Sequence, residues 1–220
     1  MLVDLSHTIG GGMSLFPTLP PPDVHPLWSH EESARSGRYQ GCTCEVTEIR
    51  MATSLGTYLD SPFHFHPQGR DVSQLSLEEC VREGICLDLG GLAPREGITA
   101  AQFPAGDWRG KALLLCTGWS QYWGGEAYYN HPFVTRQAAL ALMERGIGLL
   151  GMDTLTADDP RDPTRPTHSL LLPRGILIVE NLVGLEAILS QRFTFVAAAP
   201  KIQGAAAFPI RAFAITDNRG

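Results

Sequence analysis

Short apolar runs bounded by turn residues dominate the second half of this chain. Residues 111–116, 147–152 and 176–179 are mostly aliphatic and too short for ordinary helices, so they predict buried strands. Residues 194–198 and 210–215 are rich in aromatic and aliphatic side chains and predict two more strands. The pattern therefore favours a sheet built largely from the later part of the chain.

Helical spacing is clearest over residues 135–145. Ala138 and Leu142 lie four apart on one predicted face, Thr135 can cap the start, and Gly146 can supply a left-handed turn at the end. Strands and helices thus alternate in this half, which is typical of an α/β fold.

Two shorter helices are predicted over residues 76–82 and 183–189. Ser76 can cap the first of them, with Glu79 in the register of a capping box. Residues 42–51 are rich in Thr, Val and Ile and predict a strand. Residues 13–26 contain five prolines, which excludes a helix and predicts extended backbone, either as a flexible arm or as a functional loop.

Composition narrows the class of protein. The chain has 220 residues, 44% of them hydrophobic and 18% charged, which predicts one soluble domain spanning residues 1–220. A net charge of -6 argues against a nucleic-acid partner. Neither a basic, apolar leader nor a run long enough to cross a bilayer is visible, so we expect no membrane association and a cytoplasmic location. The five cysteines have no zinc-site spacing and are expected to be reduced thiols.

Four polar residues stand out against this background. Asp60 and His64 follow the strand predicted over residues 42–51, His168 lies in a polar, proline-rich segment predicted to be a loop, and Glu180 ends an apolar strand. Imidazole and carboxylate ligands of this kind suit Zn²⁺, Mn²⁺ or Fe²⁺. Each residue also has an ordinary structural interpretation: Asp60 could cap a turn, His168 could lie on the surface, and Glu180 could pair with a cation. Spacing alone leaves both interpretations open.

A resemblance favours the metal site. Residues 54–64, SLGTYLDSPFH, are similar to the motif H-x-G-T-H-x-D-x-P-x-H of the cyclase-like metal-dependent hydrolases, the kynurenine formamidase-like family. The matching positions are Gly56, Thr57, Asp60, Pro62 and His64. Ser54 and Tyr58 stand where the motif has histidines. Residues 3–9, 115–119, 151–154, 168–182 and 200–211 resemble further segments of the family in the same order.

The resemblance implies a fold and a set of roles. The fold is a single α/β domain of the swivelling β/β/α, cyclase-like type, with a central mixed or barrel-like sheet. Asp60, His168 and Glu180 correspond to metal ligands, and His64 corresponds to the general acid/base. With Ser54 and Tyr58 in place of two imidazoles, we expect one divalent metal, Mn²⁺ or Zn²⁺, or no metal at all.

The remaining expectations concern substrate and partners. Tyr58 could donate a hydrogen bond to a developing oxyanion, and Phe16 and Ser54 could contact substrate. The implied activity is hydrolysis of a small-molecule amide, lactam or lactone. The alternatives are a non-catalytic binding relative that has lost its metals and a metal-free lyase or isomerase. The family resemblance also implies a homo-oligomer, a dimer or tetramer.

Overall fold

The computed structural model describes residues 1–11, 13, 15–16 and 18–217. The chain divides into two compact units, one formed by residues 1–7 together with the chain from residue 53 onward, the other by residues 8–52. The first unit holds nearly all of the secondary structure. The expectation of one domain over residues 1–220 stays a prediction.

A nine-stranded mixed sheet forms the centre of the first unit, in the order β1-β13-β11-β5-β7-β9-β10-β4-β12. Its strands, in that order, are Leu2–Asp4, Phe213–Thr216, Phe193–Val196, Val81–Asp88, Ala112–Cys116, Leu149–Met152, Leu177–Glu180, Tyr58–Asp60 and Ala207–Pro209. Strands β5, β7, β9 and β10 run parallel, and the flanking strands pair antiparallel. The predicted α/β class with a mixed central sheet is confirmed.

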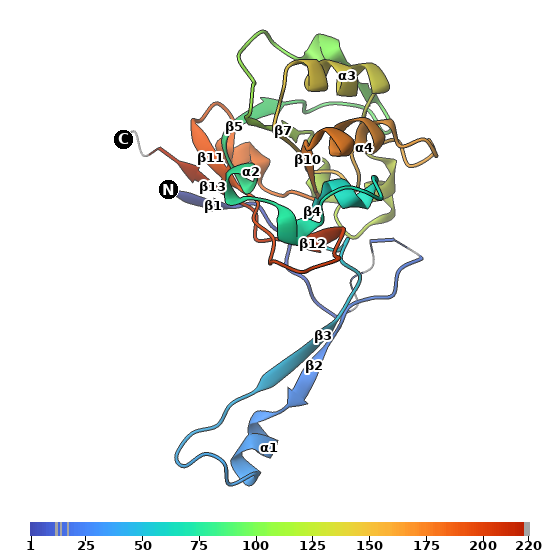
Figure 1. Cartoon of the computed structure of the whole chain (residues 1–220). Coiled ribbons are helices and arrows are strands. Elements are labelled where there is room, and N and C mark those ends of the chain that lie inside the picture. Colours follow the sequence, from blue (N-terminus) through green and yellow to red (C-terminus); the bar gives the residue numbers. More distant parts are fainter. Residues whose placement is uncertain (12, 14, 17, 218–220) are drawn as a thin grey trace. The chain divides into compact units, whose positions relative to one another are not determined.

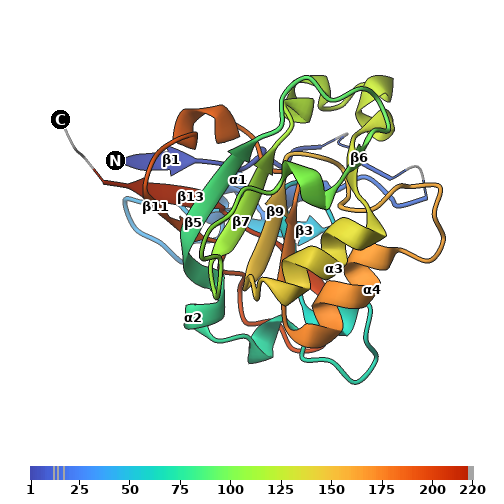
Figure 2. The ribbon, with the colours of Figure 1, turned by 90° about the horizontal axis from the view of Figure 1, so that it is seen from above.

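Helices cover one face of this sheet. Helices α3 (Arg136–Glu144) and α4 (Pro166–Leu171) lie side by side over the parallel strands (Figures 1 and 2). Leu142 and Leu171 pack there against Leu113 and Ile178 of the sheet. The opposite face buries a second apolar cluster that includes Leu114 and Phe195.

Short elements connect these layers. Helix α2 is Leu77–Cys80, and a small parallel pair joins β6 (Gly97–Ile98) to β8 (Phe133–Val134). The 3₁₀ turns are η1 Pro62–His64, η2 Val72–Gln74, η3 Ala100–Gln102, η4 Trp119–Tyr122, η5 Glu126–Asn130, η6 Leu172–Arg174 and η7 Leu185–Ile188. No helix within the described part of the chain is long and apolar enough to span a membrane.

The predicted helix ends are confirmed. The side chain of Thr135 accepts a hydrogen bond from the Ala138 N–H, and Gly146 adopts a left-handed φ of 68° after α3. Ser76 and Glu79 form the predicted capping box of α2.

Residues 185–188 form the 3₁₀ turn η7 where a helix was predicted over 183–189, and the strand predicted over 210–215 is Phe213–Thr216. Two other predictions about elements were wrong. Residues 81–82 begin the long strand β5 rather than completing a helix, because Val81 and Arg82 pair with Val196 and Phe195 of β11. His168 lies in helix α4 rather than in a loop, since Pro166 fits the first turn of a helix, where a missing N–H costs nothing.

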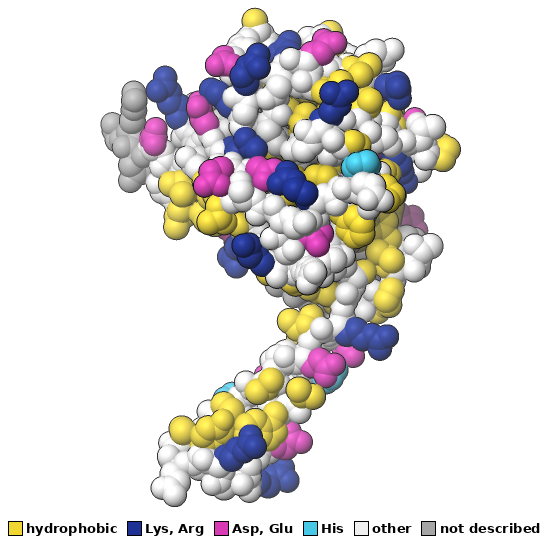
Figure 3. All heavy atoms as spheres, viewed as in Figure 1, with side chains coloured by type: hydrophobic (Ala, Val, Ile, Leu, Met, Phe, Trp, Pro, Cys, Tyr) yellow, Lys and Arg dark blue, Asp and Glu magenta, His cyan; other side chains and the backbone are white. Residues whose placement is uncertain are grey.

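The second unit contains a two-stranded hairpin. Strand β2 (Asp23–Trp28) pairs antiparallel with β3 (Val46–Arg50), and helix α1 (His30–Arg35) lies between them in sequence. The strand predicted over residues 42–51 is therefore present but shorter, and β2 and α1 were not predicted. Hydrophobic side chains are exposed along the hairpin (Figure 3), among them Val24, Leu27, Val46 and Ile49.

Candidate metal centre

Strand pairing brings two carboxylates to one face of the sheet. Strand β4 runs antiparallel to β10, with Tyr58 opposite Glu180 and Asp60 opposite Ile178. Directly paired residues project from the same face. Ile178 lies in the apolar cluster under α3 and α4, so Asp60 and Glu180 also project toward that layer. Helix α4 supplies His168 from the same side.

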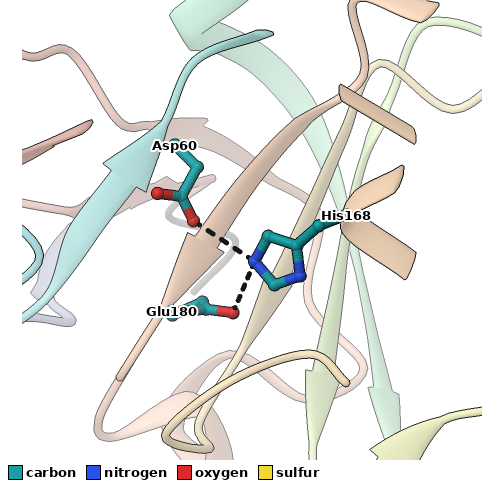
Figure 4. Close-up of side chains that lie close together, drawn as sticks. All are labelled: Asp60, His168 and Glu180. Carbon is teal, nitrogen blue, oxygen red and sulfur yellow. Dashed lines mark ion pairs between the residues drawn. The ribbon is translucent and has the colours of Figure 1, made fainter. Parts of the chain in front are cut away.

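These three side chains converge on a shared space (Figure 4). The Nε2 atom of His168 lies 3.2 Å from Oε1 of Glu180 and 3.6 Å from Oδ2 of Asp60. One ligand atom from each residue falls within 4.8 Å of the others, and all three side chains are buried. The sequence resemblance named these residues together, and the structure brings them together.

The orientation of His168 is set by Asp158, which sequence reasoning missed. The Nδ1 atom of His168 lies 2.6 Å from Oδ2 of Asp158, so we assign the proton to Nδ1 as donor and leave Nε2 facing the cluster. The backbone N–H groups of Thr167 and His168 also donate to Asp158. A carboxylate that fixes the imidazole of a metal-binding histidine is a common arrangement. The available signal in the sequence was Asp158 itself, an acidic residue at the start of the proline-rich segment that precedes His168.

Charge coupling dominates the cluster. Burial disfavours the charged form of His168, but the Glu180 charge, the hydrogen bond to Asp158 and the nearby Asp60 carboxylate outweigh it and raise the His168 pKa well above its usual value. Burial opposes ionisation of Glu180 as well, yet the charge of His168 and its hydrogen bond lower the Glu180 pKa. Burial raises the pKa of Asp60 despite its two histidine neighbours. Three carboxylates thus surround one imidazole.

Asp60 provides the test of whether a metal fits. Both of its carboxylate oxygens are buried, and neither has a hydrogen-bond partner among the described residues. An unpartnered buried carboxylate is costly unless a cation or another ligand accompanies it. Together with the Glu180 oxygen and the His168 Nε2, Asp60 offers a three-ligand set suited to a divalent ion. The residues present therefore fit a metal.

His64 lies at the edge of the cluster. It ends η1, two residues after Pro62, and its Nε2 atom is 3.6 Å from Oδ1 of Asp60. Its side chain is 29% exposed, unlike those of the three cluster residues, so it can exchange protons with solvent. The ring of Phe65 packs on both His64 and His168, with centroid distances of 5.0 and 4.7 Å.

The other predicted site residues have different positions. Tyr58 is buried in β4, and its hydroxyl donates a hydrogen bond to Oε2 of Glu180. Ser54 is half-buried in a bend before β4. Phe16 is half-buried in the second unit, and its neighbour Pro17 lies outside the described residues. The substrate contacts expected of Ser54 and Phe16 stay predictions.

Sequence reasoning also missed a network of hydrogen bonds centred on Asn181, next to the cluster. Asn181, directly after Glu180, has a left-handed φ of 58°, and its side-chain amide donates to the Gly56 carbonyl. Its side-chain oxygen accepts from the Tyr128 hydroxyl, and its backbone carbonyl accepts from Thr57. These contacts tie the segment before β4 to the end of β10. Their polar residues are ordinary in sequence, and only the fold brings them together.

A second group of possible ligands lies elsewhere in the first unit. Cys116, Asp153 and Glu186 also place one ligand atom each within 4.8 Å of one another. Here, however, Asp153 is already satisfied by the Thr117 hydroxyl and by the N–H groups of Thr117 and Gly118. This group therefore lacks the unpartnered acceptor that distinguishes Asp60.

The family can now be assigned. A family model described as putative cyclase matches residues 3–159, well over half of the chain. The chain belongs to the cyclase family. The predicted family is confirmed, and with it the expected enzyme class, a hydrolase.

Similar proteins extend along the whole chain. The kynurenine formamidase of Bacillus thuringiensis (strain Al Hakam) is 27% identical over 210 residues, covering 96% of this chain and 95% of that protein. The kynurenine formamidase of Bordetella petrii is 26% identical over 229 residues, covering 96% of each.

Solved structures agree in fold. Isatin hydrolase A from Labrenzia aggregata, bound to benzyl benzoate, superposes with a TM-score of 0.83 at 21% identity, covering 97% of this chain and 93% of that one. A predicted metal-dependent hydrolase from Bacillus stearothermophilus superposes with a TM-score of 0.77 at 24% identity, covering 97% of each.

Proposed function

We propose that this protein is a metal-dependent hydrolase that cleaves an amide bond, open-chain or lactam, in a small molecule. The observation that carries the proposal is the convergence of Asp60, His168 and Glu180, with both Asp60 oxygens buried and without a hydrogen-bond partner among the described residues. Relatives named kynurenine formamidase and isatin hydrolase support amide cleavage as the reaction class. A lactone is the third substrate class that the same chemistry would accept.

In this proposal Asp60, His168 and Glu180 hold one divalent ion, Mn²⁺ or Zn²⁺. When bound, such an ion polarises a carbonyl group and makes water more acidic. Two carboxylates with one imidazole form a hard, anionic ligand set, which favours Mn²⁺ or a weakly held Zn²⁺. Asp158 keeps the His168 ring in the ligating orientation through the 2.6 Å contact at Nδ1.

His64 acts as the general acid/base. Its Nε2 atom lies beside Asp60 and its side chain is partly exposed, so it can take a proton from water and return one to the leaving nitrogen. The Phe65 ring limits water on one side of the two histidines.

A non-catalytic binding relative is the alternative, and one observation favours it. His168 lies 3.2 Å from Glu180 and has a raised pKa, so its protonated form can offset the negative charge of the carboxylates without a metal. Metal-free lyase or isomerase chemistry would use the same His64 and carboxylates. Both alternatives require that the purified protein bind no divalent ion.

The test combines metal content with two histidine variants. Protein purified without added metal, then stripped and reloaded with Mn²⁺ or Zn²⁺, should carry about one equivalent and hydrolyse an N-aryl formamide or isatin. His64→Asn should lower the rate by about 10²–10⁴-fold while the metal content is retained. His66→Asn is the matched control, because His66 is nearby and half-buried but outside the cluster. Failure to bind either ion would contradict the proposal and favour the binding relative.

We also propose that the protein is a homo-oligomer, a dimer or tetramer, and acts in the cytoplasm. The exposed apolar residues of the hairpin support the first part, since Leu27 and Ile49 are 63% and 57% exposed. Light scattering during gel filtration measures the mass directly. A monomer at micromolar concentration would contradict the oligomer.

A further inference from the structure

Tyr58 and Glu180 form a buried cross-strand pair. The antiparallel register of β4 and β10 places them directly opposite each other, and their side chains are 3% and 1% exposed. The Tyr58 hydroxyl donates its hydrogen bond to Oε2 of Glu180. A phenol, whose ordinary pKa is about 10, keeps its proton at neutral pH and can act as the donor.

The two oxygens of Glu180 consequently have different partners. Oε1 accepts from the Ala157 N–H at 2.8 Å and faces the His168 Nε2 atom at 3.2 Å. Oε2 accepts from Tyr58. A phenol has only one O–H group, so Tyr58 cannot donate to Glu180 and to a substrate oxyanion at the same time. The oxyanion role expected of Tyr58 from the sequence conflicts with this contact.

We propose that Tyr58 is a positioning residue that occupies Oε2 of Glu180, leaves only Oε1 for the metal, and thereby limits the site to one ion. This inference rests on the proposed function, because it concerns the metal which that function requires. In the common bridging arrangement, a carboxylate gives one oxygen to each of two ions. Oε1 has a backbone N–H on one side and faces His168 on another, whereas the whole phenol of Tyr58 lies against Oε2, where a second ion would have to bind.

The first test uses Tyr58→Phe with Tyr128→Phe as the matched control. Both tyrosines are buried and each donates one hydrogen bond, but Tyr128 donates to the neutral side chain of Asn181 at 2.8 Å. Melting temperatures are measured for the metal-free proteins and after saturation with Mn²⁺. Tyr58→Phe leaves a carboxylate oxygen without its donor, which Mn²⁺ can then contact. The rise in melting temperature on adding Mn²⁺ should therefore be larger in Tyr58→Phe than in the wild type by about 4 °C. Tyr128→Phe should show the wild-type rise.

The outcomes separate this inference from the proposed function. If Mn²⁺ raises the melting temperature of Tyr58→Phe by the same amount as that of the wild type, the role of Tyr58 is overturned but the proposed metal site is not. No Mn²⁺- or Zn²⁺-induced rise in the wild type overturns both proposals. An enlarged rise confined to Tyr58→Phe supports the inference, whereas an equal enlargement in Tyr128→Phe overturns it.

A second variant tests the limit on stoichiometry and does not depend on the folding of Tyr58→Phe. Ser54→His combined with Tyr58→His removes the phenol and places two imidazoles at the motif positions that the family resemblance marks as ligands. Neutral imidazole is a far better ligand than a hydroxyl group or a protonated phenol. The stoichiometry measured by calorimetric titration with Mn²⁺ should then rise from one equivalent to two. A folded double variant that still binds one equivalent would overturn the inference.

Discussion

Asp60 and Asp153 are both fully buried at the ends of strands in the same sheet, yet their surroundings differ completely. Asp60 ends β4, and neither of its oxygens has a hydrogen-bond partner among the described residues. Asp153 follows β9 and accepts from the Thr117 hydroxyl at 2.6 Å, from the Thr117 N–H at 3.0 Å and from the Gly118 N–H at 2.7 Å. Burial raises the pKa of both carboxyls, that of Asp153 to about 6.

The difference separates a structural carboxylate, Asp153, from a candidate ligand carboxylate, Asp60. Asp153 binds the turn after β7 to the end of β9, and its hydrogen bonds contribute to folding. Asp60 accepts no hydrogen bond among the described residues and has only two histidine nitrogens 3.6 Å away, so its burial is a cost that a bound cation would offset further. Burial and residue type are the same at the two sites, and only the partners distinguish them.

The largest expected effect comes from Asp60→Asn. The substitution keeps the shape but removes the charge, so Mn²⁺ binding should fall below detection and hydrolysis should drop by about 10³-fold. The metal-free protein should melt at the wild-type temperature or above, because a buried carboxylate that accepts no hydrogen bond is gone. Calorimetric titration and thermal melts measure the two effects. A large loss of metal-free stability would show that Asp60 is structural.

Asp153→Ala should show the reverse pattern. It leaves the Thr117 hydroxyl and two backbone N–H groups without their acceptor, so the free energy of unfolding should fall by about 3 kcal/mol. Metal stoichiometry should remain that of the wild type. Urea unfolding with a metal titration on the same sample checks both. Loss of metal binding in a folded Asp153→Ala variant would remove the distinction between the two aspartates.

The smallest effect concerns Glu79, a partly exposed carboxylate with a cationic partner. The hydrogen bond from Arg70 lowers the Glu79 pKa from 4.5 to about 2. A lowered pKa in the folded state means that this stabilisation is full above pH 4.5 and is lost as the pH falls toward 2. Solvent screening keeps the effect at about 1 kcal/mol or less. Glu79→Gln should flatten the acid side of the stability profile and leave metal binding unchanged. A variant whose profile stays as steep as that of the wild type would contradict this.

Local signals predicted much of the first unit. The helix at Thr135 and the cap at Ser76 were visible because capping depends on residues three or four apart. Strand β5 was missed because its polar residues Arg82 and Glu83 interrupt the apolar pattern, and pairing with β7 and β11 determines its structure. The hairpin strand β2 was missed because Pro26 argues against a strand, although edge strands tolerate proline.

The candidate site was predictable only through the family resemblance. Spacing alone left Asp60, His168 and Glu180 open to ordinary structural interpretations, since nothing local in the sequence shows that they meet. Asn181 and Tyr128 were missed because their contact joins elements 53 residues apart, and Asp158 was missed because the turn that brings it to His168, ten residues on, has no clear sequence pattern. The hydrogen bond from Tyr58 to Glu180 likewise depends on the register of β4 and β10.

The same pairing limits when during biosynthesis the proposed ion could bind. Tyr58 and Glu180 are separated by 122 residues, and β4 sits in the sheet between two strands that are synthesised long after it. A nascent chain that has passed only Asp60 and His64 has no Glu180 to complete the ligand set. An ion at the proposed site would therefore meet its complete ligand set only after Glu180 has been synthesised. Under the proposed function, protein produced without the metal should become active when the metal is added later.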